Sequence, residues 1–171
     1  MERIWSPWRS EYIETFNNTD NKNEKKCFIC EAINSINEDA KYLIVVRREK
    51  CIIIMNKYPY NSGHILVCPL RHISQFEEFE TDELMNIMTT KKEIIVAMKK
   101  IFKPHGFNLG INIGYSAGAG MPDHLHFHIV PRWNGDANFT TSIADTKFYA
   151  NSIEGTRSKL SKILSPHHHN K

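Results

Sequence analysis

Seven residues, His124-Leu125-His126-Phe127-His128-Ile129-Val130, begin with three repeats of an imidazole followed by a large apolar side chain. A period of two is the spacing of a β-strand, so an extended backbone would place three histidines on one face and the apolar side chains on the other. At about 3.3 Å per residue, His124 and His128 would lie roughly 13 Å apart. Zinc ligands must converge within a few ångströms, so these histidines are expected to serve different sites. The alternative is a solvated, histidine-rich edge strand.

The rest of the chain predicts a sheet and one long helix. Runs of β-branched residues separated by turn residues predict strands at residues 42–47, 51–56 and 64–68. After Thr81, apolar residues recur at three- and four-residue steps until Pro104, which predicts the long helix. Residues 107–115 alternate apolar residues with Asn and Gly, so the strand expected there has a bare face that could admit a ligand. Shorter helices are expected at 31–36 and 153–164, and the histidine segment is expected as a strand over 124–130.

Composition and length bound the class of protein. The 171 residues include 22 Lys and Arg against 19 Asp and Glu, a net charge of +3, and 41% of them are hydrophobic. Such a chain can bury a core, which excludes disorder, and at about 150 residues per domain it predicts a single domain over 1–171. We expect an N-terminal arm and polar loop at 1–26, a core at 27–132 and a C-terminal extension at 133–171.

Neither a membrane nor a nucleic acid is an expected partner. Every apolar run is far shorter than the roughly 20 residues of a membrane span. The first eight residues lack the apolar stretch of a secretory signal, so a cytoplasmic location is predicted. The basic residues are dispersed, whereas nucleic-acid binding normally needs them clustered. The terminal run His167-His168-His169 is left out of the site because it can be a tag.

The four cysteines fall into two groups. Cys51 and Cys68 lie in apolar runs and are expected as small buried hydrophobes. Cys27 and Cys30 have the C-x-x-C spacing of half a zinc site, which needs two more ligands. Disulfides are not expected in a reducing compartment.

The histidine segment and the upstream stretch Asn56-Lys57-Tyr58-Pro59-Tyr60-Asn61-Ser62-Gly63-His64-Ile65-Leu66-Val67 together resemble the histidine-triad (HIT) family of nucleotide hydrolases and transferases. Three flanking motifs are similar to the bacterial diadenosine tetraphosphate phosphorylase (ATP adenylyltransferase) branch: Trp5-Ser6-Pro7-Trp8-Arg9, Ala117-Gly118-Ala119-Gly120 and Pro131-Arg132-Trp133-Asn134-Gly135-Asp136. The resemblance implies an α+β, HIT-like fold with a central antiparallel sheet, one long helix and a shorter N-terminal helix. It also implies a homodimer or a higher homo-oligomer.

The resemblance assigns catalytic roles to three histidines. The middle one of the triad, His126, would be the nucleophile that forms a nucleotidyl-histidine. A neutral imidazole is a competent nucleophile near neutral pH, and a covalent intermediate splits one hard displacement into two easier ones. His128 would contact the phosphate or protonate the leaving group, and His64 would support the constellation.

Five further residues are expected to bind substrate. Asn56 matches the ribose-binding polar residue of the family, and Asn112 is a candidate polar contact on the bare strand face. Gly118, Ala119 and Gly120 could offer backbone N–H groups to phosphate oxygens, as anion-binding nests do. Many family members carry Gln or Ser where Gly120 stands, so another group must fill any role of that side chain.

For the C-x-x-C pair, the resemblance extends to related uridylyltransferases, in which two histidines complete a zinc site. The matching set here is Cys27, Cys30, His72 and His124, a closed Cys₂His₂ arrangement of the structural type. The alternative is two buried thiols and two hydrogen-bonded histidines. No organic cofactor is expected.

The resemblance implies a specific reaction. AMP would pass from a dinucleoside polyphosphate to His126 and then to inorganic phosphate, so that diadenosine tetraphosphate gives ADP and ATP. With water as the acceptor the protein would be a hydrolase, and with a P–N substrate a nucleoside phosphoramidase. A non-catalytic alternative is a purine-nucleotide-binding or zinc-dependent interaction module in which the triad only binds phosphate.

Overall fold

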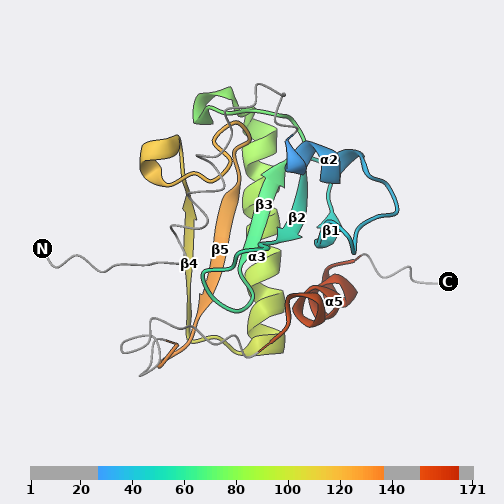
Figure 1. Ribbon diagram of the computed structural model, residues 1–171. Coiled ribbons are helices and arrows are strands. Elements are labelled where there is room, and N and C mark those ends of the chain that lie inside the picture. Colours follow the sequence, from blue (N-terminus) through green and yellow to red (C-terminus); the bar gives the residue numbers. More distant parts are fainter. Residues whose placement is uncertain (1–26, 137–150, 166–171) are drawn as a thin grey trace, which may run out of the picture. The chain divides into compact units, whose positions relative to one another are not determined.

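The computed structural model describes residues 27–136 and 151–165. Figure 1 shows the order of the elements. They are α2 (Phe28–Asn34), β1 (Ile44–Arg47), β2 (Cys51–Met55), β3 (Ile65–Pro69), α3 (Thr81–Phe102), β4 (Gly106–Ile111), β5 (Phe127–Arg132) and α5 (Ile153–Leu164), with 3₁₀ turns at Phe76–Glu78 and Tyr115–Ala117. The predicted arm at 1–26, its tryptophan motif and the terminal histidines lie outside the described residues, so the domain boundaries stay a prediction.

One antiparallel sheet organises the described residues. Its strand order is β1-β2-β3-β5-β4, and every neighbouring pair is antiparallel. The long helix α3 carries the chain from β3 to the far edge of the sheet, and β5 then returns between β3 and β4 (Figure 1). The α+β class with a central antiparallel sheet is therefore confirmed. In the described part of the chain, no helix is both long and apolar enough to span a bilayer.

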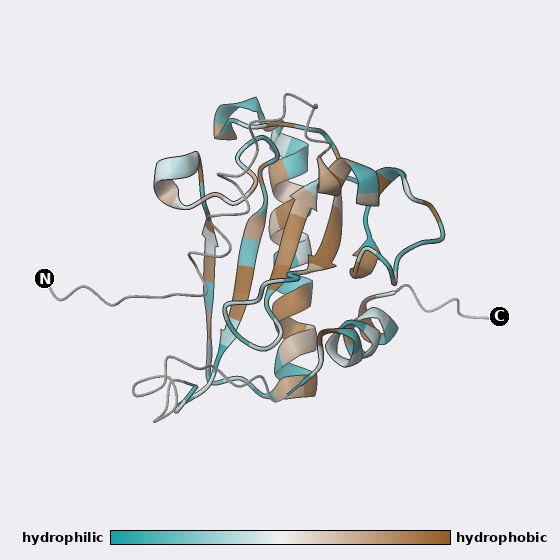
Figure 2. Ribbon diagram, in the orientation of Figure 1, coloured by the Kyte–Doolittle hydropathy of each residue, from teal (hydrophilic) through white to brown (hydrophobic). Residues whose placement is uncertain are grey.

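The two faces of the sheet bury different residues. Figure 2 shows hydrophobic residues concentrated along β2, β3 and α3. Because side chains alternate along a strand, Ile53 and Val67 pack with α3 and α5 on one face, whereas Ile52 and Leu66 pack with α2 on the other. The even-numbered residues of β5 share the α2 face, since His128 pairs with Leu66. The histidines therefore lie on the side of the sheet opposite α3.

The helices predicted after Thr81 and over 153–164 agree closely with the structure, whereas the one predicted over 31–36 is displaced. α3 begins where the sequence predicted, behind a capping box in which Glu80 and Glu83 bond each other's backbone N–H groups. It ends at Phe102, and the next residue, Lys103, is left-handed with φ 47°. α2 starts at Phe28, three residues earlier than predicted, because Cys27 Sγ caps the N–H of Cys30.

Two predicted strands differ in extent from the observed ones. The strand expected over 107–115 ends at Ile111, and Leu109 is 49% exposed because β4 is at the edge of the sheet. The strand expected over 124–130 begins only at Phe127 and runs to Arg132. The Leu125 N–H donates instead to Ile73 O at 2.8 Å, outside the sheet. His124 and His126 therefore precede the strand.

Candidate active site and metal centre

His128 lies on β5 between two neighbouring strands. It pairs with Leu66 of β3 and with Gly110 of β4. Directly opposed residues of an antiparallel pair point to the same face of a sheet, so Gly110 shares the face of the imidazole. A Cβ atom at Gly110 would meet nothing within 4 Å. The bare strand face predicted from the sequence therefore provides open space beside His128.

His126 is oriented by a bond within its own segment. Its Nδ1 lies 2.9 Å from the carbonyl oxygen of His124. A carbonyl can only accept, so Nδ1 of His126 carries the proton and donates it to this bond. The lone pair of a neutral His126 is then on Nε2. Burial lowers the pKa of His126, which keeps the ring neutral at physiological pH.

The turn before β3 brings His64 to His128. Gly63 adopts φ +78°, where a side chain is disfavoured, and a Cβ there would lie 3.1 Å from Pro131 Cγ. The next residue, His64, is fully buried, and its Nε2 lies 2.9 Å from His128 Nδ1. Ring centroids are 5.1 Å apart for His64 and His128 and 4.9 Å apart for His126 and His128. The structure thus brings the three predicted catalytic histidines together.

Burial also keeps the other two imidazoles neutral. Desolvation by burial, with smaller electrostatic contributions from the neighbouring imidazoles, lowers the pKa of His64 to about 3 and the pKa of His128 to about 4. His128 Nε2 is buried, and no group in the described ranges bonds it. Buried polar atoms are normally hydrogen-bonded, so this nitrogen is suited to meet a ligand.

Tyr60, for which no sequence motif predicted a role, lies against the histidines. Its ring stacks on His128 with centroids 5.8 Å apart and contacts His64 at 4.6 Å, while half of the residue is exposed. Its backbone N–H donates to His64 Nδ1 at 3.0 Å. The sequence places Tyr60 between two predicted site residues, Asn56 and His64. A single tyrosine in a turn, however, does not predict which side chains it contacts.

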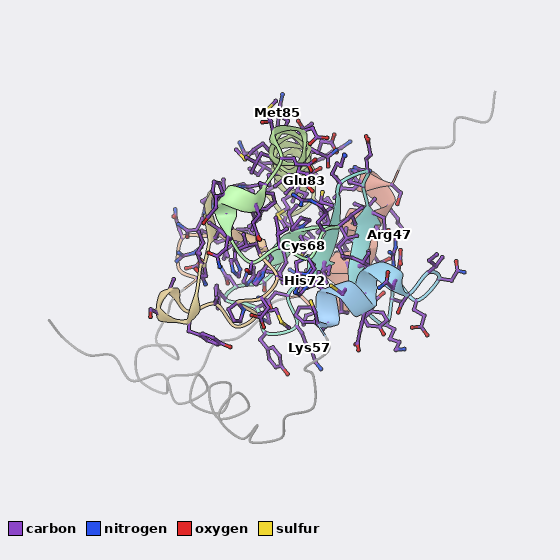
Figure 3. The ribbon with its side chains drawn as sticks, turned by 90° about the horizontal axis from the view of Figure 1, so that it is seen from above. Arg47, Lys57, Cys68, His72, Glu83 and Met85 are labelled. Carbon is purple, nitrogen blue, oxygen red and sulfur yellow. The ribbon has the colours of Figure 1, made fainter. Side chains whose placement is uncertain are left out.

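The four predicted metal ligands form one cluster. The ligand atoms of Cys27, Cys30, His72 and His124 all lie within 4.8 Å of one another. Cys27 Sγ is 3.3 Å from His124 Nδ1, and Cys30 Sγ is 3.2 Å from His72 Nδ1. In Figure 3 the sheet lies between α3 and α2, and His72 lies on the α2 side.

The cluster fits a tetrahedral cation. Bonds of about 2.3 Å to sulfur and about 2.1 Å to nitrogen would separate S and N ligands by about 3.6 Å, close to the observed spacings. His124 Nε2 lies 3.0 Å from the carbonyl oxygen of Pro69, so Nε2 holds the proton and Nδ1 faces the thiols with its lone pair. Burial and the neighbouring Cys27 raise the pKa of Cys30 to about 11, and burial lowers the pKa of His124 to about 4. A bound divalent cation would favour the thiolate.

Two arginines hold the segments that carry the candidate metal ligands, and no sequence motif predicted a role for either arginine. Arg47 donates to the carbonyls of Ala32, Ile33 and Ser35 at the end of α2. Arg71, next to His72, donates through Nε and Nη2 to the buried Glu83 carboxylate, at 2.7 Å in both bonds. Figure 3 labels Arg47 and Glu83. Long-range ion pairs and bonds to carbonyls have no local sequence signal.

Asn56, predicted as a ribose contact, lies beside the histidines. Its side-chain nitrogen is 3.2 Å from His64 Nδ1, and its Oδ1 accepts the backbone N–H of Tyr58 at 2.9 Å. The residue also lines a cleft of about 520 Å³ between the 56–63 turn and the start of α5.

The other four predicted substrate-binding residues occupy the link from β4 to β5. Asn112 follows β4 and donates to Gly118 O at 3.3 Å, so it fastens the loop. The N–H groups of Gly118 and Ala119 donate to Tyr115 O and Gly114 O. Of the three predicted phosphate-binding N–H groups, only that of Gly120 has no backbone acceptor in the described part of the chain.

Comparison with known proteins agrees with this geometry. The model of the HIT domain family matches residues 37–135. An AP-4-A phosphorylase of Mycobacterium tuberculosis (strain CDC 1551 / Oshkosh) is 35% identical over 162 residues, which cover 94% of this chain and 83% of that protein.

Solved structures show the same fold. A hypothetical histidine triad nucleotide-binding protein of Sulfolobus tokodaii superposes with a TM-score of 0.60 and 31% identity, over 80% of this chain and 88% of that one. A Zn-bound histidine triad family protein of Mycobacterium smegmatis gives a TM-score of 0.62 at 24% identity, over 80% and 94%; at that identity the likeness concerns the fold alone. By motif, architecture and similarity, the chain belongs to the HIT domain family.

Proposed function

We propose that this protein is a nucleotidyltransferase that works through a nucleotidyl-histidine at His126 and phosphorolyses diadenosine tetraphosphate to ADP and ATP. The observation that carries the proposal is the pair of neighbouring rings on one face of the sheet. His126 has its lone pair on Nε2, and His128 has a buried Nε2 without a partner in the described residues. The similarity to an AP-4-A phosphorylase supports the choice of substrate.

The proposed reaction uses these atoms. Nε2 of His126 attacks the α-phosphorus, a P–N bond forms, and the P–O bond to the departing ATP breaks. The ring then carries positive charge, which the bond from Nδ1–H to the His124 carbonyl stabilises. An oxygen of inorganic phosphate next attacks the same phosphorus, which releases ADP and returns the neutral imidazole.

The neutral state of His128 favours a polyphosphate leaving group. With a pKa of about 4, His128 is a neutral imidazole at neutral pH. Its one N–H can donate a hydrogen bond to the leaving group, but the ring does not act as a general acid. ATP leaves as a stable anion and needs no proton, whereas the amine of a phosphoramidate does. Phosphate is preferred over water as acceptor on the similarity to the phosphorylase.

Product analysis tests the reaction. Purified protein with diadenosine tetraphosphate should give ADP and ATP in equal amounts, and only when inorganic phosphate is added. AMP and ATP formed without phosphate would show a hydrolase. The intact protein quenched with substrate should gain the mass of AMP, and His126→Ala should lose both this adduct and turnover by several orders of magnitude. His105→Ala, at an exposed histidine near the far end of β5, should keep both.

We also propose that Cys27, Cys30, His72 and His124 hold a structural zinc ion that ties α2 to the segment before β5. The bound ion would supply a cross-link and no catalytic step. The purified protein should contain about one zinc per chain, and Cys30→Ser should lose it and unfold at lower urea concentration. Cys51→Ala, at a buried thiol outside the cluster, should keep its zinc. A wild-type protein without zinc in zinc-supplemented medium would contradict this assignment.

The cytoplasmic location stays a prediction. For the assembly, we propose a homodimer. β4 is an edge strand on which Leu109 is 49% exposed, and Met85 and Met88 are exposed on α3. Unpaired strand edges and apolar surface are typical of an interface between copies. Sedimentation should give twice the 19.9 kDa chain mass, and Leu109→Lys should weaken the dimer.

A further inference from the structure

Two donors converge on one nitrogen of His64. The Tyr60 backbone N–H donates to His64 Nδ1 at 3.0 Å, and the side-chain nitrogen of Asn56 lies 3.2 Å from the same atom. The orientation of the Asn56 amide is set independently, because its Oδ1 accepts the Tyr58 N–H. An imidazole nitrogen that accepts hydrogen bonds carries no proton, so Nδ1 is the unprotonated nitrogen of His64.

The lone pair on His64 Nδ1 determines which nitrogens of His64 and His128 carry protons. A neutral His64 must carry its proton on Nε2, which lies 2.9 Å from His128 Nδ1. His128 Nδ1 therefore accepts, and the proton of a neutral His128 must be on Nε2, the buried atom that no described group bonds. A continuous row of bonds thus runs from Asn56 through two imidazoles and ends in one N–H beside His126.

We propose that Asn56 is a positioning residue whose amide, together with the Tyr60 N–H, fixes the protons of His64 and His128, so that His128 offers an N–H rather than a lone pair to the phosphoryl group. The catalytic meaning of this assignment rests on the proposed function. With the opposite tautomer, the lone pairs of His126 and His128 would both face an anionic phosphate and repel it. One amide hydrogen and one lone pair of Asn56 remain for the predicted ribose contact.

A carboxylate at position 56 would reverse the arrangement. Asn56→Asp keeps an oxygen for the Tyr58 N–H and hardly changes the volume. Its second oxygen, however, would face the lone pair of His64 Nδ1, and two acceptors repel unless a proton lies between them. Protonation of His64 at Nδ1 removes the repulsion, and the charge-assisted bond to the carboxylate outweighs the lost bond from the Tyr60 N–H. The substitution thus changes the proton position and leaves the shape of the site unchanged.

The experiment is ¹⁵N NMR of the histidine rings in the free, full-length protein at neutral pH, with assignments from His64→Gln and His128→Gln. In the wild-type protein, His64 and His128 should both show a protonated Nε2 and an unprotonated Nδ1. In Asn56→Asp, His64 Nδ1 should shift to the position of a protonated nitrogen. Asn108→Asp, the same chemical change on the bare face of β4, should leave both rings as in the wild type.

Asn56→Ala provides a second variant if Asn56→Asp does not fold: the Tyr60 N–H is then the one donor left at His64 Nδ1 among the described residues, so this nitrogen should shift downfield, toward an unprotonated nitrogen with weaker hydrogen bonding. A wild-type spectrum with Nδ1 protonated on either ring would overturn the proposal, as would wild-type shifts in both Asn56 variants. Because the measurement needs no substrate, it separates this proposal from the proposed reaction. A protein with the expected tautomers and no adduct at His126 would refute only the reaction.

Discussion

Gly63 links the turn that carries Asn56 to the buried His64. Its φ of +78° strains the backbone for any side chain, and a Cβ there, 3.1 Å from Pro131 Cγ, would push the proline ring by a few tenths of an ångström. Pro131 lies on β5, the strand that carries His128. A single missing Cβ therefore allows the upstream turn to pack against the histidine strand.

Gly63→Ala should lower the free energy of unfolding by about 2 kcal/mol, because a left-handed backbone conformation and a close contact are imposed together. The shift of the urea midpoint measures the effect. Gly106→Ala is the matched control, since a Cβ there meets nothing within 4 Å, and it should leave the midpoint almost unchanged. Equal midpoints for the two variants would show that the turn relaxes freely.

At the scale of elements, the regular parts were predictable and the irregular ones were not. Runs of β-branched residues identified β1, β2 and β3, a period of two identified β4 and β5, and the apolar steps after Thr81 identified α3. The start of β5 was misplaced because the alternation of His124 to Ile129 continues through residues whose backbone bonds a loop instead of a strand. Motif resemblance named the residues of the metal cluster and the histidine group, which the structure brings together. It did not reveal the roles of Arg47 and Tyr60, because both depend on long-range contacts.

α2 should depend on the arginine that closes its C-terminal end. Arg47→Met keeps the apolar stem but removes the bonds to three carbonyls, and it should cost about 2 kcal/mol of stability. Because Cys30 is on α2, the variant should also release zinc faster to a coloured chelator if the proposed site is filled. Lys41→Met breaks an exposed ion pair and should leave both measurements unchanged. Arg47→Met with wild-type values would show that α2 is held by packing alone.

On the scale of the whole molecule, the sheet separates two kinds of chemistry. The α3 face is apolar, whereas the other face carries the buried imidazoles, the cluster of sulfur and nitrogen ligands, and α2. Burying neutral histidines in this way makes the stability of the fold depend on pH.

Stability should fall as the solution is acidified. Burial lowers the pKa of His64 to about 3 and that of His128 to about 4, whereas both bind protons near pH 6.5 in the unfolded chain. The unfolded state therefore binds more protons between these values. The stabilisation is complete above about pH 6.5 and is lost on acidification, by about 1.4 kcal/mol per pH unit for each histidine. Urea midpoints between about pH 7 and pH 5 measure the slope.

The His64→Asn, His128→Asn double variant is the control for this slope. It lacks both buried imidazoles, so its unfolding free energy should change less over the same pH interval. An identical slope in the double variant would assign the pH dependence to other groups.

The division of β5 into two faces also restricts how the length of this segment can vary among relatives. Phe127 and Ile129 belong to the apolar layer under α3, while His128 belongs to the opposite face. A one-residue insertion or deletion within β5 that shifts its pairing would exchange the two sets. A phenyl ring would then lie on the face that carries the proposed active site, and an imidazole would lie in the apolar core. Apolar residues of β5 could be replaced by one another, but the number of residues within the paired strand has to stay constant.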